Sequence, residues 1–410
     1  MIITLSGIYW FAIIFAVGLV LNLIAAKLKL SDVLLLIIFG VLIRYIGFVD
    51  IQKLIPANVL VGFSIFALIL IIFDSSTKFK LSELVKFSPY SLKLALFFLF
   101  LNVVLLTAFV HLFFTKSLLD FQFLSVSILF SALMSGTAPE ITLSIFRGFK
   151  NIKNKIIEIL EFESVINTPL TLIIPLIILD FYKGVLKTNI FILQFLNQIM
   201  TGVGTGLVLG IVIFMLMRRK LFKSISPLII ISTALGSYAL AEILGGSGVI
   251  SVTVLGIVFS RLYIKEKFKL ERFTETFTLF FKIIVFILLG MLIAVPLDKY
   301  FLIKSGILFL IFLGLRYAAV NYTFIKSSIS IKEKLFMGLN APKGIATVLL
   351  TFVLSTEEIP QPEIILGLIF AFIVYSLLIS SLTSSLSGWM LRLNEPEKSI
   401  LKRLKGNKKL

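Results

Sequence analysis

The chain has 410 residues, of which 59% are hydrophobic and 15% charged, and its mean hydropathy is +1.10. This composition has more apolar surface than the core of a soluble protein of this size can bury, which excludes an ordinary water-soluble globular domain. Cysteine is absent, so disulfide and thiol chemistry are excluded as well. The lipid bilayer is therefore expected to be the main solvent and a partner of the chain.

Apolar runs close to the 20-residue length needed to cross a bilayer recur along the whole sequence, separated by short polar loops. They predict an all-α polytopic membrane protein with about 13 transmembrane helices. The expected spans are residues 5–26, 31–48, 58–77, 89–114, 121–147, 156–181, 190–217, 225–244, 247–261, 273–295, 299–324, 334–355 and 364–390. We expect one transmembrane domain at residues 1–392, followed by a basic cytoplasmic tail at 393–410.

The basic residues that give the chain a formal net charge of +18 are distributed according to the predicted topology. Of the 39 Lys and Arg residues, 28 fall in the tail and in every second loop counted back from it, whereas 6 fall on the opposite side. By the positive-inside rule the C-terminus is expected in the cytoplasm of a cell-membrane protein, and the N-terminus outside. A nucleic-acid partner is not expected, because the positive charge is explained by topology.

Five basic residues fall inside the predicted spans, where an unpaired charge is costly. They are Arg44, Lys93, Lys282, Arg316 and Lys343. Arg316 is deep enough to need an anion, and Glu163 is its expected partner. Breaking such a buried pair would leave one uncompensated ion, so we expect it to be structural rather than part of the transported charge.

Two short segments repeat the same pattern in separate spans. Thr137-Ala138-Pro139-Glu140 lies in the run at 121–147, and Asn340-Ala341-Pro342-Lys343 lies in the run at 334–355. Proline and glycine weaken the helical hydrogen-bond ladder, so both spans are expected to be broken. The two segments are seven helices apart, so they cross the membrane in opposite directions, which indicates two inverted-topology repeats. Glu140 and Lys343 are expected to offset the dipoles of the half-helices. The alternative is that the two segments resemble each other by chance.

A polar patch is expected on one turn of the run at 156–181. Glu163 and Asn167 are four residues apart, as are Ser164 and Thr168, so these side chains share adjoining faces of a helix. Hydroxyl and amide oxygens suit a hard cation such as Na⁺ or K⁺. The candidate metal ligands are therefore Ser164, Asn167 and Thr168 of this patch, together with Thr137 of the run at 121–147. An interhelical hydrogen-bond cluster is the alternative.

Two further ionisable residues lie near the ends of predicted spans. Asp74 closes the run at 58–77, where it is either a proton carrier or an interfacial capping residue. His111, the only histidine, lies at the expected outer end of the run at 89–114, and is interpreted as a solvated residue rather than a proton relay.

Several of these motifs resemble the NhaP-type sodium/proton exchangers of the monovalent cation:proton antiporter superfamily. Residues 239–248, Ala-Leu-Ala-Glu-Ile-Leu-Gly-Gly-Ser-Gly, are similar to the family's "AE-x-x-G-x-SG" helix pair, and Glu161-x-Glu163-Ser164-x-x-Asn167 resembles its "E-x-E-S-x-x-N-D" segment. Residues 135–139 resemble its "S-P-T-D-P" broken helix, and residues 341–344 its "RG" or "PRG" segment. The resemblance implies thirteen helices, a homodimer, crossed broken helices, a Glu163–Arg316 ion pair and an elevator-like movement.

The chain departs from the family at the two family aspartates. Thr168 stands where the family has its ion-binding Asp, and Ala138 stands where it has the Asp of "TDP". A hydroxyl cannot exchange a proton for a cation, so another acid must do so in an antiporter. Glu140 is the first candidate, Asp74 the second and Glu163 the third.

The sequence thus predicts a secondary-active antiporter that exchanges Na⁺ or K⁺ for H⁺ by alternating access. No enzymatic activity and no cofactor are expected. Two alternatives stay open: a cation transporter of the same fold without proton coupling, and a non-transporting accessory membrane protein.

Overall fold

The computed structural model describes residues 2–28, 31–46, 57–77, 81–115, 120–138, 155–184, 191–217, 226–261, 267–293, 296, 298–327, 329–386 and 390–391. These residues form helices joined by loops and contain no strand. The helices are α1 (Ile2–Leu28), α2 (Asp32–Ile46), α4 (Ala57–Thr77), α5 (Leu81–Leu101), the π-helical turn η1 (Asn102–Leu106), α6 (Thr107–Phe114), α7 (Phe121–Leu133), α9 (Lys155–Tyr182), α10 (Phe191–Met217), α11 (Ser226–Ile243), α12 (Gly248–Arg261), α13 (Lys267–Leu292), α14 (Lys299–Thr323), α15 (Ile331–Leu339), α16 (Ile345–Ser355) and α17 (Pro362–Ser385).

The helices follow the apolar runs of the sequence. Seven helices in the described part of the chain are long and apolar enough to span a membrane, and five further apolar helices have 10–17 residues. The all-helical membrane fold is therefore confirmed. The count of thirteen spans stays a prediction, as do the division at residue 392 and the tail, which lies outside the described residues.

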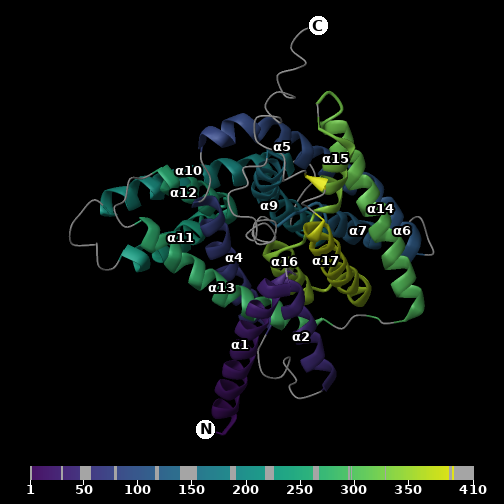
Figure 1. The fold of residues 1–410 in the computed structure, drawn as a ribbon, viewed down its shortest axis with the longest axis horizontal. Helices are drawn as coiled ribbons and strands as arrows, with labels where there is room; N and C mark the ends of the chain where they lie inside the picture. Colours follow the sequence, from purple (N-terminus) through teal and green to yellow (C-terminus); the bar gives the residue numbers. More distant parts are fainter. Residues whose placement is uncertain are drawn as a thin grey trace.

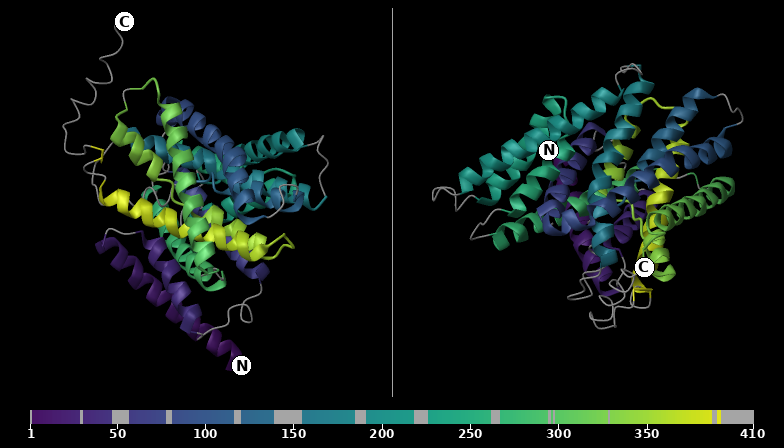
Figure 2. Two further views of the ribbon diagram at one scale, coloured as in Figure 1. Left: turned by 90° about the vertical axis from the view of Figure 1, so that its right-hand side faces the viewer. Right: turned by 90° about the horizontal axis from the view of Figure 1, so that it is seen from above.

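Two groups of helices make up the molecule (Figure 1). The side bundle consists of α1, α2, α4 and α10–α13, with α10, α11 and α12 packed against one another and α13 packed against α2 and α4. The core bundle consists of α5–α7, η1, α9 and α14–α17. Figure 2 shows α1 and α2 as a pair that projects from one edge of the molecule. Helices α4 and α16 pack together where the two groups meet.

The backbones of α2 and α13 approach each other closely at two glycines. A Cβ atom on Gly40 would lie 2.2 Å from the carbonyl oxygen of Ile287, and one on Gly290 would lie 2.3 Å from that of Ile37. Small residues allow such approaches in membranes, where van der Waals packing rather than the hydrophobic effect drives helix association. This contact ties α2 to α13.

Each of the five basic residues inside the predicted spans has a partner. Arg44 donates to the carbonyl oxygens of Met291 and Leu292, at the end of α13. Lys282 forms an ion pair with Asp32, which also accepts from Asn22. The ammonium of Lys93 lies 4.5 Å from the centre of the Tyr322 ring, a cation–π contact. The partners of Arg316 and Lys343 belong to the candidate site.

Candidate ion-binding site

Two helices end opposite each other in the core bundle. α7 ends at Leu133, and Ser135, Gly136 and Thr137 begin a non-helical segment. α15 ends at Leu339, and residues 340–344 are not helical until α16 begins at Ile345. Pro342 has no N–H and clashes with a preceding helical turn, which explains this second interruption. The continuation of the first span, with Pro139 and Glu140, lies outside the described residues, so the crossing of two broken helices stays a prediction.

The two non-helical segments touch through their backbones. The N–H of Ala138 donates to the carbonyl oxygen of Pro342 at 2.9 Å. In a membrane, irregular backbone is tolerated only where protein or a water-filled cavity surrounds it. Both segments meet this condition, because residues 134–138 and 340–344 are buried.

Lys343 connects the second segment to the first. Its side chain is fully buried, and its ammonium donates to the carbonyl oxygens of Met134 at 2.5 Å and Gly136 at 2.6 Å. The nitrogen also lies 4.5 Å from the centre of the Phe312 ring. The carbonyls after α7 are at the negative end of its helix dipole, so a cation is stabilised there.

The polar face of α9 contacts the segment after α7. The amide of Asn167 donates to the carbonyl oxygen of Ser135 at 2.6 Å, and the hydroxyls of Thr137 and Ser164 are 2.9 Å apart. Thr168 donates to the carbonyl oxygen of Ser164 at 2.7 Å. The structure thus brings together all four candidate cation ligands. Asn167 Oδ1 is buried and accepts no hydrogen bond in the described part of the chain.

Glu163 and Arg316 form a bidentate ion pair beside this face. The guanidinium of Arg316 donates to the two carboxylate oxygens of Glu163 at 2.8 and 2.6 Å, and both side chains have 0% exposure. Two parallel hydrogen bonds fix both planar groups in orientation. The pair joins α9 to α14 and holds the carboxylate away from solvent.

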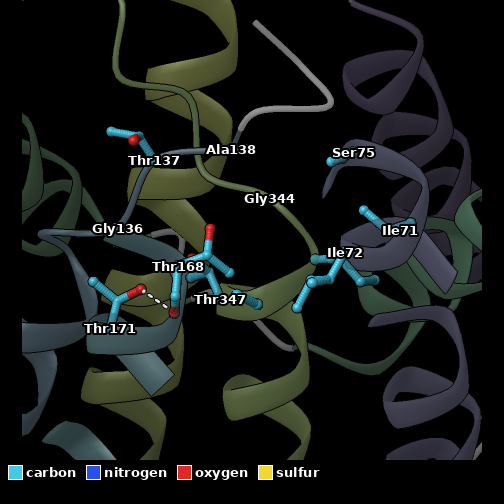
Figure 3. Close-up of a pocket in the computed structure, with 12 residues that line it drawn as sticks. Ile71, Ile72, Ser75, Gly136, Thr137, Ala138, Thr168, Thr171, Gly344 and Thr347 are labelled. Carbon is cyan, nitrogen blue, oxygen red and sulfur yellow. Dashed lines mark hydrogen bonds between the residues drawn. The ribbon is translucent and has the colours of Figure 1, made fainter. Parts of the chain in front are cut away.

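A small cavity of about 20 Å³ lies where these segments meet α4 (Figure 3). Ile71, Ile72 and Ser75 of α4 lie on one side, and Thr168 and Thr171 of α9 on the other. Residues 136–138 and 344–347 complete the lining. A single water molecule needs about 10–15 Å³, so this cavity can hold one water or one dehydrated monovalent cation.

The two proton-carrier candidates are placed differently. Asp74 is near the end of α4, has 7% exposure and directly precedes Ser75, which lines the cavity. Glu140 lies outside the described residues, two positions beyond the lining residue Ala138. None of the residues that line the described cavity is a carboxylate.

Sequence reasoning missed part of the lining. Ser75, Thr171 and Thr347, which carry hydroxyl groups, line the cavity, and the carbonyls of Met134 and Gly136 hold Lys343. Thr171 could have been predicted from the sequence, because it is four residues after Asn167 and therefore lies on the same face of α9. Carbonyl groups carry no sequence signal, because every residue has one.

The interruption between α15 and α16, the buried ammonium of Lys343 and the adjacent cavity are typical of a polytopic membrane transporter. The profile of the sodium/hydrogen exchanger transmembrane family matches residues 11–387, so the chain belongs to that family.

Known members of the family resemble the chain over most of its length. It is 26% identical over 378 residues to a protein named probable Na⁺/H⁺ antiporter 2 of Methanocaldococcus jannaschii, covering 87% of this chain and 86% of that protein. It is 21% identical to a K⁺/H⁺ antiporter NhaP2 of a Shewanella species, covering 67% of this chain and 48% of the relative. The solved sodium proton antiporter MjNhaP1 of M. jannaschii has the same fold, with a TM-score of 0.77, 19% identity and coverage of 96% of this chain and 100% of that one. The NhaP-type assignment is confirmed, and the chain is a cation:proton antiporter.

Proposed function

We propose that this antiporter exchanges Na⁺ or K⁺ for protons by alternating access, with the cation bound at the cavity between α4, α9 and the two non-helical segments. Its proposed ligands are Thr137 and Thr168, which line the cavity, together with Ser164 and Asn167, which are hydrogen-bonded to the segment after α7 but do not line the cavity in this conformation. The transporter works as a homodimer in the cell membrane, with its N-terminus outside and its C-terminus in the cytoplasm, in accord with the loop charges.

One observation carries the proposal. The cavity lies where two chain segments leave the helical conformation, and its lining includes hydroxyl-bearing residues from four parts of the chain: α4, the segment after α7, α9 and the start of α16. Neutral oxygen atoms are ligands that hard cations accept. Its size suits one cation from which most water has been removed, and relatives named for Na⁺ and for K⁺ support either ion.

Proton coupling requires an acid that can exchange its proton for the cation. Glu163 is held by Arg316, so the exchange is assigned to Glu140 and Asp74. Asp74 directly precedes Ser75, which lines the cavity, and Glu140 follows the lining segment of residues 136–138. Lys343 offsets the dipole of α7 in this scheme.

The test uses purified protein in liposomes that contain a pH-sensitive dye. An imposed Na⁺ or K⁺ gradient should drive proton movement in the wild type. Glu140→Gln and Asp74→Asn should each reduce this coupled flux at least tenfold, whereas Glu363→Gln, at the exposed start of α17, should leave it unchanged. Full coupled flux in both site variants would refute the assignment of the two acids.

The alternative that the sequence left open, cation transport without proton coupling, is tested in the same liposomes. It predicts radiotracer Na⁺ or Rb⁺ uptake with no change in the dye signal in the same liposomes. Uptake matched by proton movement excludes it.

A further inference from the structure

A row of buried polar side chains lies along one face of the membrane helix formed by α5, η1 and α6. Asn102, Thr107 and His111 have exposures of 0%, 5% and 5%. The sequence interpretation of His111 as a solvated residue is therefore wrong. Leu106 and Val110, each with 0% exposure, lie on the same buried side, whereas Val104 and Leu105 are exposed on the other.

The π-helical turn aligns these side chains. The N–H of Thr107 donates to the carbonyl oxygen of Asn102, five residues back, so this turn holds one residue more than an α-helical turn. Asn102 and Thr107 are thus brought to one face, and His111 follows Thr107 by four residues in regular α-helix. Isolated π-helical turns inside α-helices are frequent at functional sites.

Within the described residues, the polar atoms of these buried side chains have no hydrogen-bond partner. Both amide atoms of Asn102, the hydroxyl of Thr107 and both ring nitrogens of His111 form no hydrogen bond within the described part of the chain. Ser131, on the neighbouring α7, has 0% exposure, and its hydroxyl also forms no hydrogen bond with the described residues. Burying an amide or hydroxyl without a hydrogen bond costs about 2–7 kcal/mol, so six such atoms on two contacting helices need another source of partners.

The row points from the ion site toward one membrane face. Ser131 is one turn before Ser135, whose carbonyl oxygen accepts from Asn167. α7 packs against both η1 and α6, and the His111 ring lies 6.0 Å from that of Phe123, near the start of α7. Ordered water supplies hydrogen bonds to buried polar groups elsewhere in proteins. Polar residues inside membrane spans commonly mark pathways for ions and protons.

We infer that Ser131, Asn102, Thr107 and His111 line a hydrated path between the ion site and the membrane face near His111, with water providing the missing hydrogen bonds. This inference rests on the proposed function for what the path carries, and on the proposed topology for its assignment to the outer face. The low exposure of all four side chains means that the path is closed to bulk solvent near His111 in this conformation.

The experiment uses the absence of cysteine from the natural sequence. Single cysteines at residues 102, 107, 111 and 131 are treated with a membrane-impermeant thiosulfonate, applied separately to each membrane face under turnover conditions. Val104→Cys and Leu105→Cys are lipid-side controls, and Leu106→Cys and Val110→Cys are controls for buried apolar neighbours. Thiolate forms only in water, so a hydrated path predicts modification of the four test positions at least tenfold faster than of the lipid-side controls, from the His111 face.

Each variant is included only if it elutes from size-exclusion chromatography as the wild type does. If Asn102→Cys does not fold, the labelling rates at residues 107, 111 and 131 test for the hydrated path. Slow modification of all test positions, equal to that of Val104→Cys and Leu105→Cys from either face, would overturn the inference. Labelling does not require proton-coupled transport, so loss of coupling and absence of the path are separate results.

Discussion

The ammonium of Lys343 lies 2.6 Å from the carbonyl oxygen of Gly136 and connects the segment between α15 and α16 to the segment after α7. Its second acceptor, the carbonyl oxygen of Met134, closes α7 at the negative end of the helix dipole. A second link, the hydrogen bond from Ala138 to Pro342, lies beside it. One side chain of the segment between α15 and α16 therefore stabilises carbonyl groups at the end of α7 and just after it.

Removing the charge of Lys343 should disturb both segments. In Lys343→Met, the carbonyl oxygens of Met134 and Gly136 lose their donor inside the membrane, where an unsatisfied polar group costs several kcal/mol. We expect transport to fall at least tenfold and the detergent-solubilised protein to unfold at lower temperature. Lys343→Arg keeps a positive charge and hydrogen-bond donors, so it should retain more stability than Lys343→Met in a thermal-shift measurement. Equal loss in both variants would contradict a role for the charge.

The Glu163–Arg316 pair should be more important for stability than for ion exchange. Glu163→Gln leaves a buried guanidinium without a counter-ion, and breaking one side of such a pair costs about 3–5 kcal/mol. The melting temperature should fall by roughly 5–10 °C. The double variant Glu163→Leu/Arg316→Met removes both charges and should recover part of that loss. If Glu163→Gln melts as the wild type does while losing proton coupling, Glu163 is the proton carrier instead.

The sequence was most informative for residue types that have low free energy in only one kind of environment inside a membrane. Charged residues inside apolar runs need partners, so the pairing of Arg316 with Glu163 was a natural prediction, and the structure places their atoms 2.6 Å apart. Proline beside an ionisable residue in mid-span predicted the interruption at residues 340–344, where the helix stops. Apolar run lengths similarly located the helices.

The sequence was less informative about neutral polar groups. Serine and threonine satisfy their hydroxyls on their own helix, as Thr351 does on the carbonyl oxygen of Thr347, so their presence in a span predicts little. His111 was misread because its position near a helix end suggested exposure, and the cover provided by α7 depends on tertiary packing. The π-helical turn that aligns Asn102 with Thr107 has no proline or glycine to signal it.

Gly136 should tolerate no side chain, because the segment after α7 lies against α9. A Cβ atom there would be 2.7 Å from Thr171 Oγ1, and overpacking of this kind costs about 1–3 kcal/mol. Gly136→Ala should therefore lower the rate of transport severalfold and reduce thermal stability. Gly314→Ala is the matched control, since a Cβ atom at Gly314 meets nothing within 4 Å. Thr171→Ala, added to Gly136→Ala, should restore part of the stability; no recovery would show that the contact with Thr171 is not the cause.

Thr168 tests whether hydroxyl oxygens of the cavity bind the cation. Thr168→Val keeps the shape of the side chain but removes the oxygen, which lies on α9 at the cavity. Loss of one ligand should weaken cation binding by about 1–2 kcal/mol, a rise of roughly 5–30-fold in the KM for Na⁺ or K⁺. The maximal rate should change less than the KM, and Thr233→Val, whose hydroxyl donates within α11 to the carbonyl oxygen of Ile229, is the control. An unchanged KM in Thr168→Val, measured from the cation dependence of proton movement in liposomes, would remove Thr168 from the set of ligands.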